Sequence, residues 1–194
     1  MIVGDPESFA IESAITMAIA DTSQRALGFF IVHIRGSVFG VRTPDASMLA
    51  CSFDEVKRRL DGRGTHRMPN LSGIDAPLVA EAVLDAIYGN SGRSSYFGMT
   101  SSEFTDAIYG NRLIWAPDGD EAFDDGSHIL QFDVEDRVRL LAFRNLDCRT
   151  DAINSLREAW IEGDAFYRVL ADWSALFAEE WTGTLREANT TGPH

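Results

Sequence analysis

A very short connection between two extended segments constrains the fold of this chain more than any other feature. Residues 28–36, Gly-Phe-Phe-Ile-Val-His-Ile-Arg-Gly, are rich in β-branched and aromatic side chains and predict a strand closed by a glycine. Only Gly36 and Ser37 separate this strand from residues 38–41, which can turn back as a hairpin partner. A parallel partner would need a crossover of about a dozen residues or more. We therefore expect antiparallel pairing.

Further strands are predicted on both sides of this hairpin. Apolar and polar residues partly alternate over 9–20, which indicates a strand, although the frequent alanines leave a helix as the competing interpretation. Residues 128–134 and 137–145 predict a second hairpin across Glu135 and Asp136. Short strands are also expected at 112–116 and, from a weaker pattern, at 153–161.

Four helices are predicted from capping signals and apolar spacing. Ser52 and Glu55 match a capping box, in which each side chain satisfies a free backbone N–H, so a helix should run to about residue 61. A second helix should begin at Asp75, with Pro77 in its first turn, and end at Gly89. The other two are expected over 102–109 and, as an amphipathic C-terminal helix, over 164–181.

One six-residue sequence, Asp-Ala-Ile-Tyr-Gly-Asn, occurs at 85–90 and again at 106–111. Two copies are too few for a solenoid, which needs at least three units. We interpret each copy as the end of a helix, with Ile and Tyr packed inward and Gly in the left-handed conformation of a C-cap.

These elements predict a single α+β domain over residues 1–185, followed by a flexible tail at 186–194. An antiparallel sheet should be packed on one side by helices, the C-terminal one among them. With 194 residues, of which 45% are hydrophobic, the chain is long enough to bury a sizeable core.

The net charge of −13 is unevenly distributed. Residues 25–67 carry +4, whereas residues 68–136 carry −11. The densest part is 118–125, where five of eight residues are carboxylates, and we call this stretch the acidic segment. Because nucleic acids are bound through Lys and Arg, such a charge distribution argues against a nucleic-acid partner. The acidic segment is either a solvated loop that aids solubility or one side of an interface with a basic partner.

No complete catalytic or cofactor motif is present. The chain lacks a nucleophile elbow, a phosphate-binding loop and the short His or Cys spacing of a zinc site, so we expect no enzyme, cofactor or metal. A site built from distant residues, such as His128 with Asp124 and Cys148, stays open, and a small cytosolic hydrolase with a dispersed active site is the alternative function.

Several features favour a cytoplasmic protein. Cys51 and Cys148 form no paired motif, which suits a reducing compartment. No uncharged stretch exceeds nine residues, whereas a membrane-spanning helix needs about 20 apolar residues. An export signal would begin with basic residues, but no basic residue precedes Arg25.

Three stretches resemble a known family. The opening residues 1–12, Met-Ile-Val-Gly-Asp-Pro-Glu-Ser-Phe-Ala-Ile-Glu, are similar to the start of the immunity protein 42 family, which protects bacteria from polymorphic toxins. Residues 28–40 resemble the second strand of that family, and 160–173 resemble its C-terminal strand and helix. The matching positions resemble determinants of the fold, so the likeness transfers no functional residues.

The resemblance implies an antitoxin that binds and neutralises one cognate toxin domain, encoded next to it, by stoichiometric protein–protein interaction. We expect no membrane partner, and the resemblance does not indicate an oligomeric state. A basic, nuclease-type toxin would complement the acidic segment, because a site built for phosphates is positively charged. We expect toxin contacts from five carboxylates and one aromatic anchor, namely Trp115, Asp118, Asp120, Glu121, Asp124 and Asp125.

Overall fold

Two separate antiparallel sheets form the framework of the protein. The computed structural model describes residues 1–89, 91–115, 121–146 and 149–190. The first sheet has the order β1-β2-β3-β4, and β5 also pairs with β3. Its strands are β1 (Ile2–Asp5), β2 (Phe9–Ala18), β3 (Ala26–Ile34), β4 (Ser37–Phe39) and β5 (Ser47–Met48). The hairpin of β3 and β4 is antiparallel, with Ile34 opposite Ser37, which confirms the expected pairing.

The second sheet contains three strands in the order β10-β9-β8. These are β8 (Ser127–Val134), β9 (Arg137–Arg144) and β10 (Arg157–Glu162), all antiparallel. The turn between β8 and β9 consists of Glu135 and Asp136, as predicted, and Glu135 adopts a positive φ of 54°. A small hairpin, β6 (Ser95–Tyr96) with β7 (Met99–Thr100), is separate from both sheets.

In the described part of the chain, five α-helices surround the sheets. They are α1 (Leu49–Asp61), α2 (Ala76–Tyr88), α3 (Ser101–Gly110), α4 (Arg149–Ser155) and α5 (Gly163–Thr190). Two short 3-10 turns, η1 (Pro69–Leu71) and η2 (Glu121–Phe123), lie in the connections. Helix α5 continues to Thr190, beyond the expected helix end at residue 181, because its last turns contain good helix formers such as Leu185 and Arg186.

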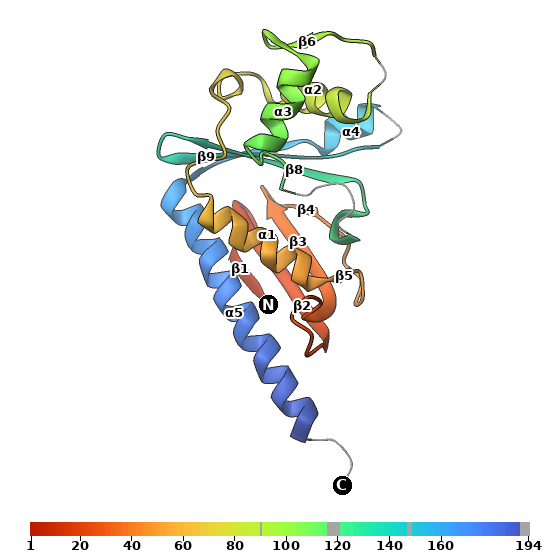
Figure 1. Ribbon diagram of the computed structural model, residues 1–194, viewed down its shortest axis with the longest axis vertical. Helices are drawn as coiled ribbons and strands as arrows, with labels where there is room; N and C mark the ends of the chain where they lie inside the picture. The colour runs from red at the N-terminus through yellow and green to blue at the C-terminus, as the bar shows by residue number, and fades with distance from the viewer. Residues whose placement is uncertain (90, 116–120, 147–148, 191–194) are drawn as a thin grey trace.

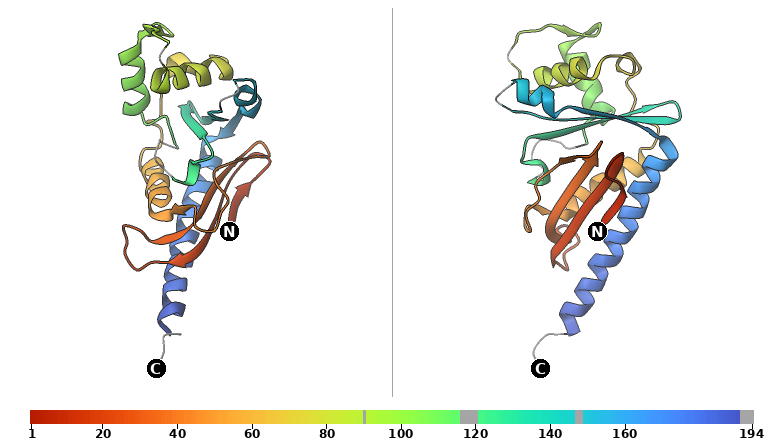
Figure 2. Two further views of the ribbon diagram at one scale, coloured as in Figure 1. Left: turned by 90° about the vertical axis from the view of Figure 1, so that its right-hand side faces the viewer. Right: turned by 180° about the vertical axis from the view of Figure 1, so that it is seen from behind.

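The three-stranded sheet lies between two hydrophobic cores (Figure 1). On one side of it is the lower unit, defined here as the five-stranded sheet with α1 and α5. On the other side is the upper unit, defined as α2, α3, α4 and the β6–β7 hairpin; the two further views in Figure 2 show the same order of layers. Ile129 and Leu140 belong to the lower core, whereas Leu130 and Leu141 belong to the upper core. Because both faces of this sheet are covered, seven of the eight residues of β8 and six of the eight residues of β9 are buried.

Interlocking aromatic rings fill the lower core. Trp173 of α5 packs edge-on against Phe30 of β3, with ring centroids 5.0 Å apart, and stacks on Phe177 at 5.3 Å. Its indole N–H donates to the Ser13 hydroxyl at 3.0 Å. The predicted C-terminal amphipathic helix is therefore confirmed, and its aromatic stripe is core, not a ligand site.

Some local predictions were wrong for identifiable reasons. Helix α1 begins after Met48, one turn before the expected capping box, so Ser52 is buried inside the helix and Glu55 pairs with Arg58 and Arg59 instead. The real capping box joins Thr100 and Glu103 at the start of α3. The expected strand at 112–116 is reduced to one bridge, between Ile114 and Leu130.

The repeated hexapeptide does end two helices, but its detailed geometry differs from our interpretation. Gly89 follows α2 with φ −80°, and Gly110 is still helical, so neither glycine is left-handed. Ile108 is buried as expected, whereas Tyr88 and Tyr109 are 41% and 55% exposed. The predicted strand at 153–161 also begins only at Arg157, because α4 precedes it.

Candidate functional site

The described part of the acidic segment is anchored by apolar side chains. Its 3-10 turn η2 buries Ala122 and Phe123, which join the lower core. Glu121 and Asp124, on either side of this pair, are exposed. The buried side chains therefore hold the backbone in place, and the carboxylates of Glu121 and Asp124 point to solvent from it.

Asp125 has a structural role. Its carboxylate forms an ion pair with Arg144 of β9 at 3.1 Å and accepts a hydrogen bond from the Ser127 N–H at 3.1 Å. A longer bond from the Gly40 N–H, 3.4 Å, links it to the lower unit. These contacts hold the acidic segment against both sheets. Because the Asp125 carboxylate is paired with Arg144, it is less available to a charged partner.

The expected aromatic anchor is wrong, since Trp115 is only 1% exposed. Its ring packs against Phe9 and Phe166, each with centroids 5.9 Å away, and the Arg59 guanidinium lies over it at 5.2 Å. The neighbouring sequence is acidic, but the lower core takes the large apolar side chain. Asp118 and Asp120 lie outside the described residues, so of the predicted contacts the structure places Glu121 and Asp124 at the surface.

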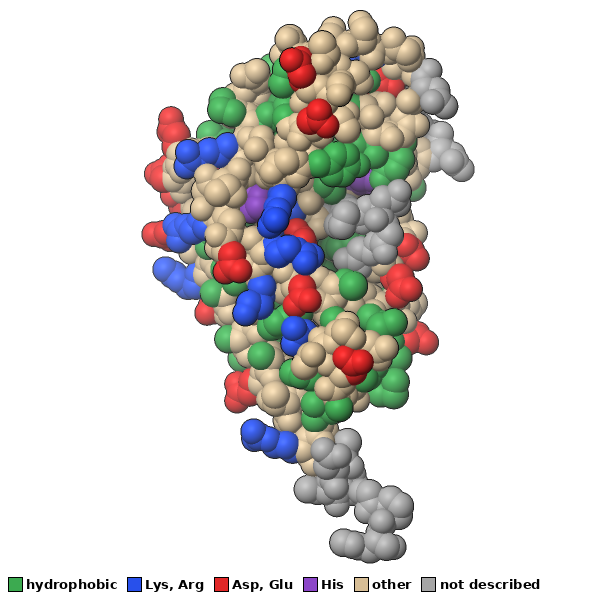
Figure 3. All heavy atoms as spheres, viewed as in Figure 1, with side chains coloured by type: hydrophobic (Ala, Val, Ile, Leu, Met, Phe, Trp, Pro, Cys, Tyr) green, Lys and Arg blue, Asp and Glu red, His purple; other side chains and the backbone are tan. Residues whose placement is uncertain are grey.

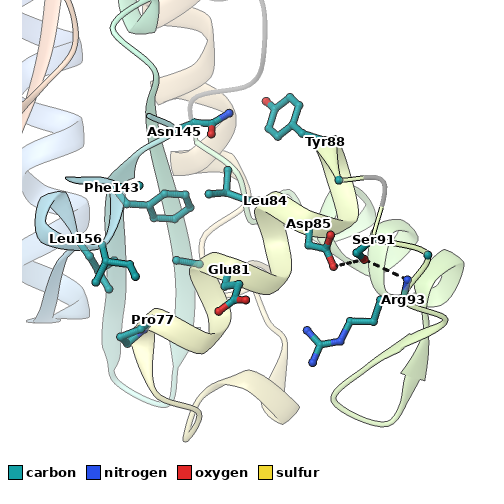
Figure 4. A pocket seen from close by; sticks show the side chains of 15 residues that line it. Pro77, Glu81, Leu84, Asp85, Tyr88, Ser91, Arg93, Phe143, Asn145 and Leu156 are labelled. Atoms are coloured by element: carbon teal, nitrogen blue, oxygen red, sulfur yellow. Dashed lines mark hydrogen bonds between the residues drawn. The ribbon is translucent and has the colours of Figure 1, made fainter. Parts of the chain in front are cut away.

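A groove of about 790 Å³ lies between α2, the end of β9 and α4 (Figure 4). Its apolar lining includes Leu84 of α2, Phe143 of β9 and, from the α4 side, Ile153 and Leu156. This volume falls in the range of ordinary binding pockets, roughly 300 to 1,000 Å³. Sequence reasoning missed the groove because its walls come from three separate segments of the chain. One of them, at α4, was expected to belong to a strand over 153–161.

Carboxylates from α2 stand beside this apolar lining. Asp85 follows Glu81 by about one helical turn, and both side chains line the groove. Hydrogen bonds from the hydroxyls of Ser91, 2.7 Å, and Tyr96, 2.8 Å, hold the pKa of Asp85 below its usual range. Asp85 therefore stays ionised, and Arg93 is the cation on this wall.

The groove is continuous with the acidic segment. The Asn145 N–H, at the groove, donates to the Gly126 carbonyl at 2.8 Å. Nearby, His128 stacks on Phe143 with ring centroids 5.6 Å apart and hydrogen-bonds the Tyr88 hydroxyl through Nε2 at 3.1 Å. One partner could therefore contact both features.

Several basic side chains are exposed near α1. Lys57, Arg58 and Arg67 are exposed on α1 and the segment after it, and Figure 3 shows basic side chains over the middle of this face with Asp and Glu side chains between them. The exposed carboxylates Glu121 and Asp124 belong instead to the strongly acidic stretch of the chain.

A buried polar network joins α1 to the three-stranded sheet. Arg59 is 0% exposed, forms an ion pair with Glu55 at 2.9 Å and donates to the Gln131 amide oxygen at 3.1 Å. It also donates to the carbonyls of Arg112, 3.3 Å, and Ile114, 2.5 Å. Burial lowers the pKa of Arg59 to about 10, so the guanidinium stays charged at neutral pH.

His66 and Tyr167 complete this network around Asp133. The Asp133 carboxylate accepts from the Tyr167 hydroxyl at 2.8 Å and from the His66 backbone N–H at 3.2 Å. Burial, followed by the charge of Arg59, lowers the pKa of His66, and burial raises the pKa of Tyr167. Because these side chains are buried and bonded to one another, the network stabilises the junction of the layers and offers no open active site.

No metal centre forms among residues 1–89, 91–115, 121–146 and 149–190, where no group of three or more His, Cys, Asp or Glu side chains converges. His128, considered above as a ligand, uses Nδ1 for the Gly126 carbonyl at 2.9 Å and Nε2 for Tyr88. Cys148 lies outside the described residues. In the same part of the chain, no helix is both long and apolar enough to cross a membrane.

The fold has a counterpart among known structures. The crystal structure of CdiI from Burkholderia dolosa AUO158 superimposes with a TM-score of 0.56 over 90% of this chain and 99% of that one. The two sequences are 15% identical, so the likeness concerns the α+β fold alone. No protein of curated function matches the sequence.

Sequence comparison then identifies the family. The profile of immunity protein 42 matches residues 1–176, and the chain belongs to that family, which confirms the resemblance of its opening segments. Its role is accordingly that of an immunity protein, or antitoxin.

Proposed function

We propose that the protein neutralises a basic, nuclease-type toxin by stoichiometric binding in the cytoplasm, with the acidic segment as part of the contact surface. Family membership supports the antitoxin role. The exposed carboxylates of Glu121 and Asp124 on an anchored backbone are the observation that supports a basic partner. Opposed charges steer such partners together and raise the association rate.

The mode of inhibition follows from electrostatics. A nuclease holds phosphates with Lys and Arg, and a carboxylate held on a rigid loop can occupy the same positive site. Asp118 and Asp120 belong to this proposal on sequence grounds, and Asp125 supports it by fastening the segment to Arg144. The buried network around Arg59 offers no open site for a hydrolase, so binding is the favoured function.

Charge neutralisation tests this proposal. The double variant Glu121→Gln/Asp124→Asn should leave the fold intact and slow association with the toxin by about tenfold at low salt, an effect that shrinks as salt is added. The probe is the toxin domain encoded next to this chain, with rates measured by stopped-flow or surface plasmon resonance.

A matched control separates local from global charge. Asp172→Asn/Glu179→Gln removes the same two charges from exposed positions of α5 and should change the rate much less. Equal rates for both double variants would show that the acidic segment is not part of the contact. If the wild-type chain neither binds the toxin nor rescues cells from it, the antitoxin proposal for this pair fails altogether.

A further inference from the structure

The groove in the upper unit has an exposed apolar rim. Ile153 of α4 is 52% exposed and Tyr88 of α2 is 41% exposed, and both line the groove. Leu78 and Leu146, next to the lining residues Pro77 and Asn145, are 53% and 37% exposed. Two large, exposed apolar side chains, Ile153 and Tyr88, thus line an open groove, and exposed apolar surface of this kind marks interaction sites.

We propose that this groove is the anchor site for the cognate toxin, and that it takes an apolar side chain flanked by basic residues. This inference rests on the function proposed above and adds the part of the surface that supplies affinity. The acidic segment steers the encounter, whereas the groove holds the docked partner. Burial of an apolar anchor in a central pocket typically accounts for most of the energy of an interface.

The chemistry of the walls selects the occupant. Leu84, Phe143 and Leu156 offer apolar contacts to a side chain that enters the groove. Glu81 and Asp85 border the same space with one cation, Arg93, so two carboxylates face one guanidinium and the remaining negative charge favours a Lys or Arg beside the anchor.

Continuity with the acidic segment supports a protein occupant over a small molecule. The bond from Asn145 to Gly126 and the stacking of His128 on Phe143 join the groove to the base of that segment. A stable interface covers roughly 800 Å² on each partner, which exceeds what a groove of this size can offer alone. A toxin domain that covers both features meets this requirement.

Truncation of the rim tests the inference. Ile153→Ser should weaken binding of the neighbouring-gene toxin domain by about tenfold to a hundredfold in isothermal titration, mainly through faster dissociation. Leu176→Ser is the matched control, because Leu176 is 45% exposed on α5, away from the groove, and should bind like the wild type. Thermal melts of both variants should match that of the wild type, since neither side chain is buried.

The outcomes separate the two proposals. Wild-type neutralisation with unchanged affinity for Ile153→Ser would overturn the groove assignment and leave the antitoxin function standing. Absence of wild-type binding would overturn both. Light scattering identifies a competing occupant: a wild-type dimer that Ile153→Ser converts to a monomer would show that a second copy of this chain fills the groove, and would also overturn the assignment.

Discussion

The two cores on either side of the three-stranded sheet differ in how completely they are closed. In the lower unit, α5 runs along the five-stranded sheet, and Trp173, Phe166 and Phe177 are each 0% exposed. In the upper unit, α2 and α4 leave a groove beside β9, and large apolar side chains such as Leu78 and Ile153 remain half exposed. The lower unit therefore has the character of a scaffold, whereas the upper unit carries the groove that we propose as the binding surface.

This difference shows how the protein can combine a fixed fold with a surface for one partner. The shared sheet is buried on both faces, so its upper face is held rigidly by the lower core. Sites carried by rigid elements are positioned more precisely than sites on free loops. Changes in the lower unit should thus affect stability, and changes at the groove should affect affinity.

The largest effect is expected from emptying the lower core. Trp173→Ala removes the ring that packs on Phe30 and Phe177 and the hydrogen bond to Ser13, and should reduce the free energy of unfolding by about 4 kcal/mol. Ile153→Ala at the groove should change it by less than about 0.5 kcal/mol. Urea denaturation of both variants measures the contrast, and equal losses would remove the distinction between scaffold and binding surface.

The junction between the units should be nearly as sensitive. Arg59→Ala leaves the amide oxygen of Gln131 and two backbone carbonyls without their donor and removes one of the two cations beside Glu55, and we expect a loss of about 3 kcal/mol. Arg58→Ala, the exposed neighbour in the same helix, should cost less than about 0.5 kcal/mol. A small effect of Arg59→Ala in thermal unfolding would show that the network is not what joins the layers.

A smaller effect should follow from uncapping α3 in the upper unit. Thr100→Ala removes the hydroxyl that accepts from the Glu103 N–H at 3.3 Å, and about 1 kcal/mol of stability should be lost. Ser102→Ala, two residues into the helix, serves as the control. Toxin affinity should stay close to wild type in both variants, and a large loss would extend the binding surface to α3.

The smallest effect concerns pH. Burial lowers the pKa of His66 in the folded state, so the unfolded chain, with an ordinary value of 6.5, takes up its proton first as the pH falls. The free energy of unfolding should therefore decrease as the pH falls through about 6.5. His66→Gln should flatten this part of the curve. An identical slope for the variant between pH 7.5 and 5.5 would contradict the assignment.

Patterns that depend on neighbouring residues were predictive, and those that depend on distant contacts were not. The β3–β4 and β8–β9 hairpins and helices α2 and α5 were predicted from alternation, turn residues and apolar spacing. The division into two sheets could not be foreseen, because it follows from burial of β8 and β9 on both faces. Tertiary packing also displaced the start of α1 from its expected capping box at Ser52.

The candidate site was predictable only in part. A run of charge is visible in the sequence, so the exposed positions of Glu121 and Asp124 could be anticipated. The burial of Trp115 and the pairing of Asp125 with Arg144 depend on residues far away in the chain. The groove forms because α4 lies beside α2 and β9, and no local sequence pattern predicts that arrangement.

Hydrogen–deuterium exchange of the free protein and of its complex with the toxin tests the central claim most directly, because it maps the contact without any substitution. Binding should slow exchange in α2, in α4 and around η2, and should leave the exposed face of α5 unchanged. Protection confined to the lower unit, with α2 and α4 exchanging as in the free protein, would contradict the account.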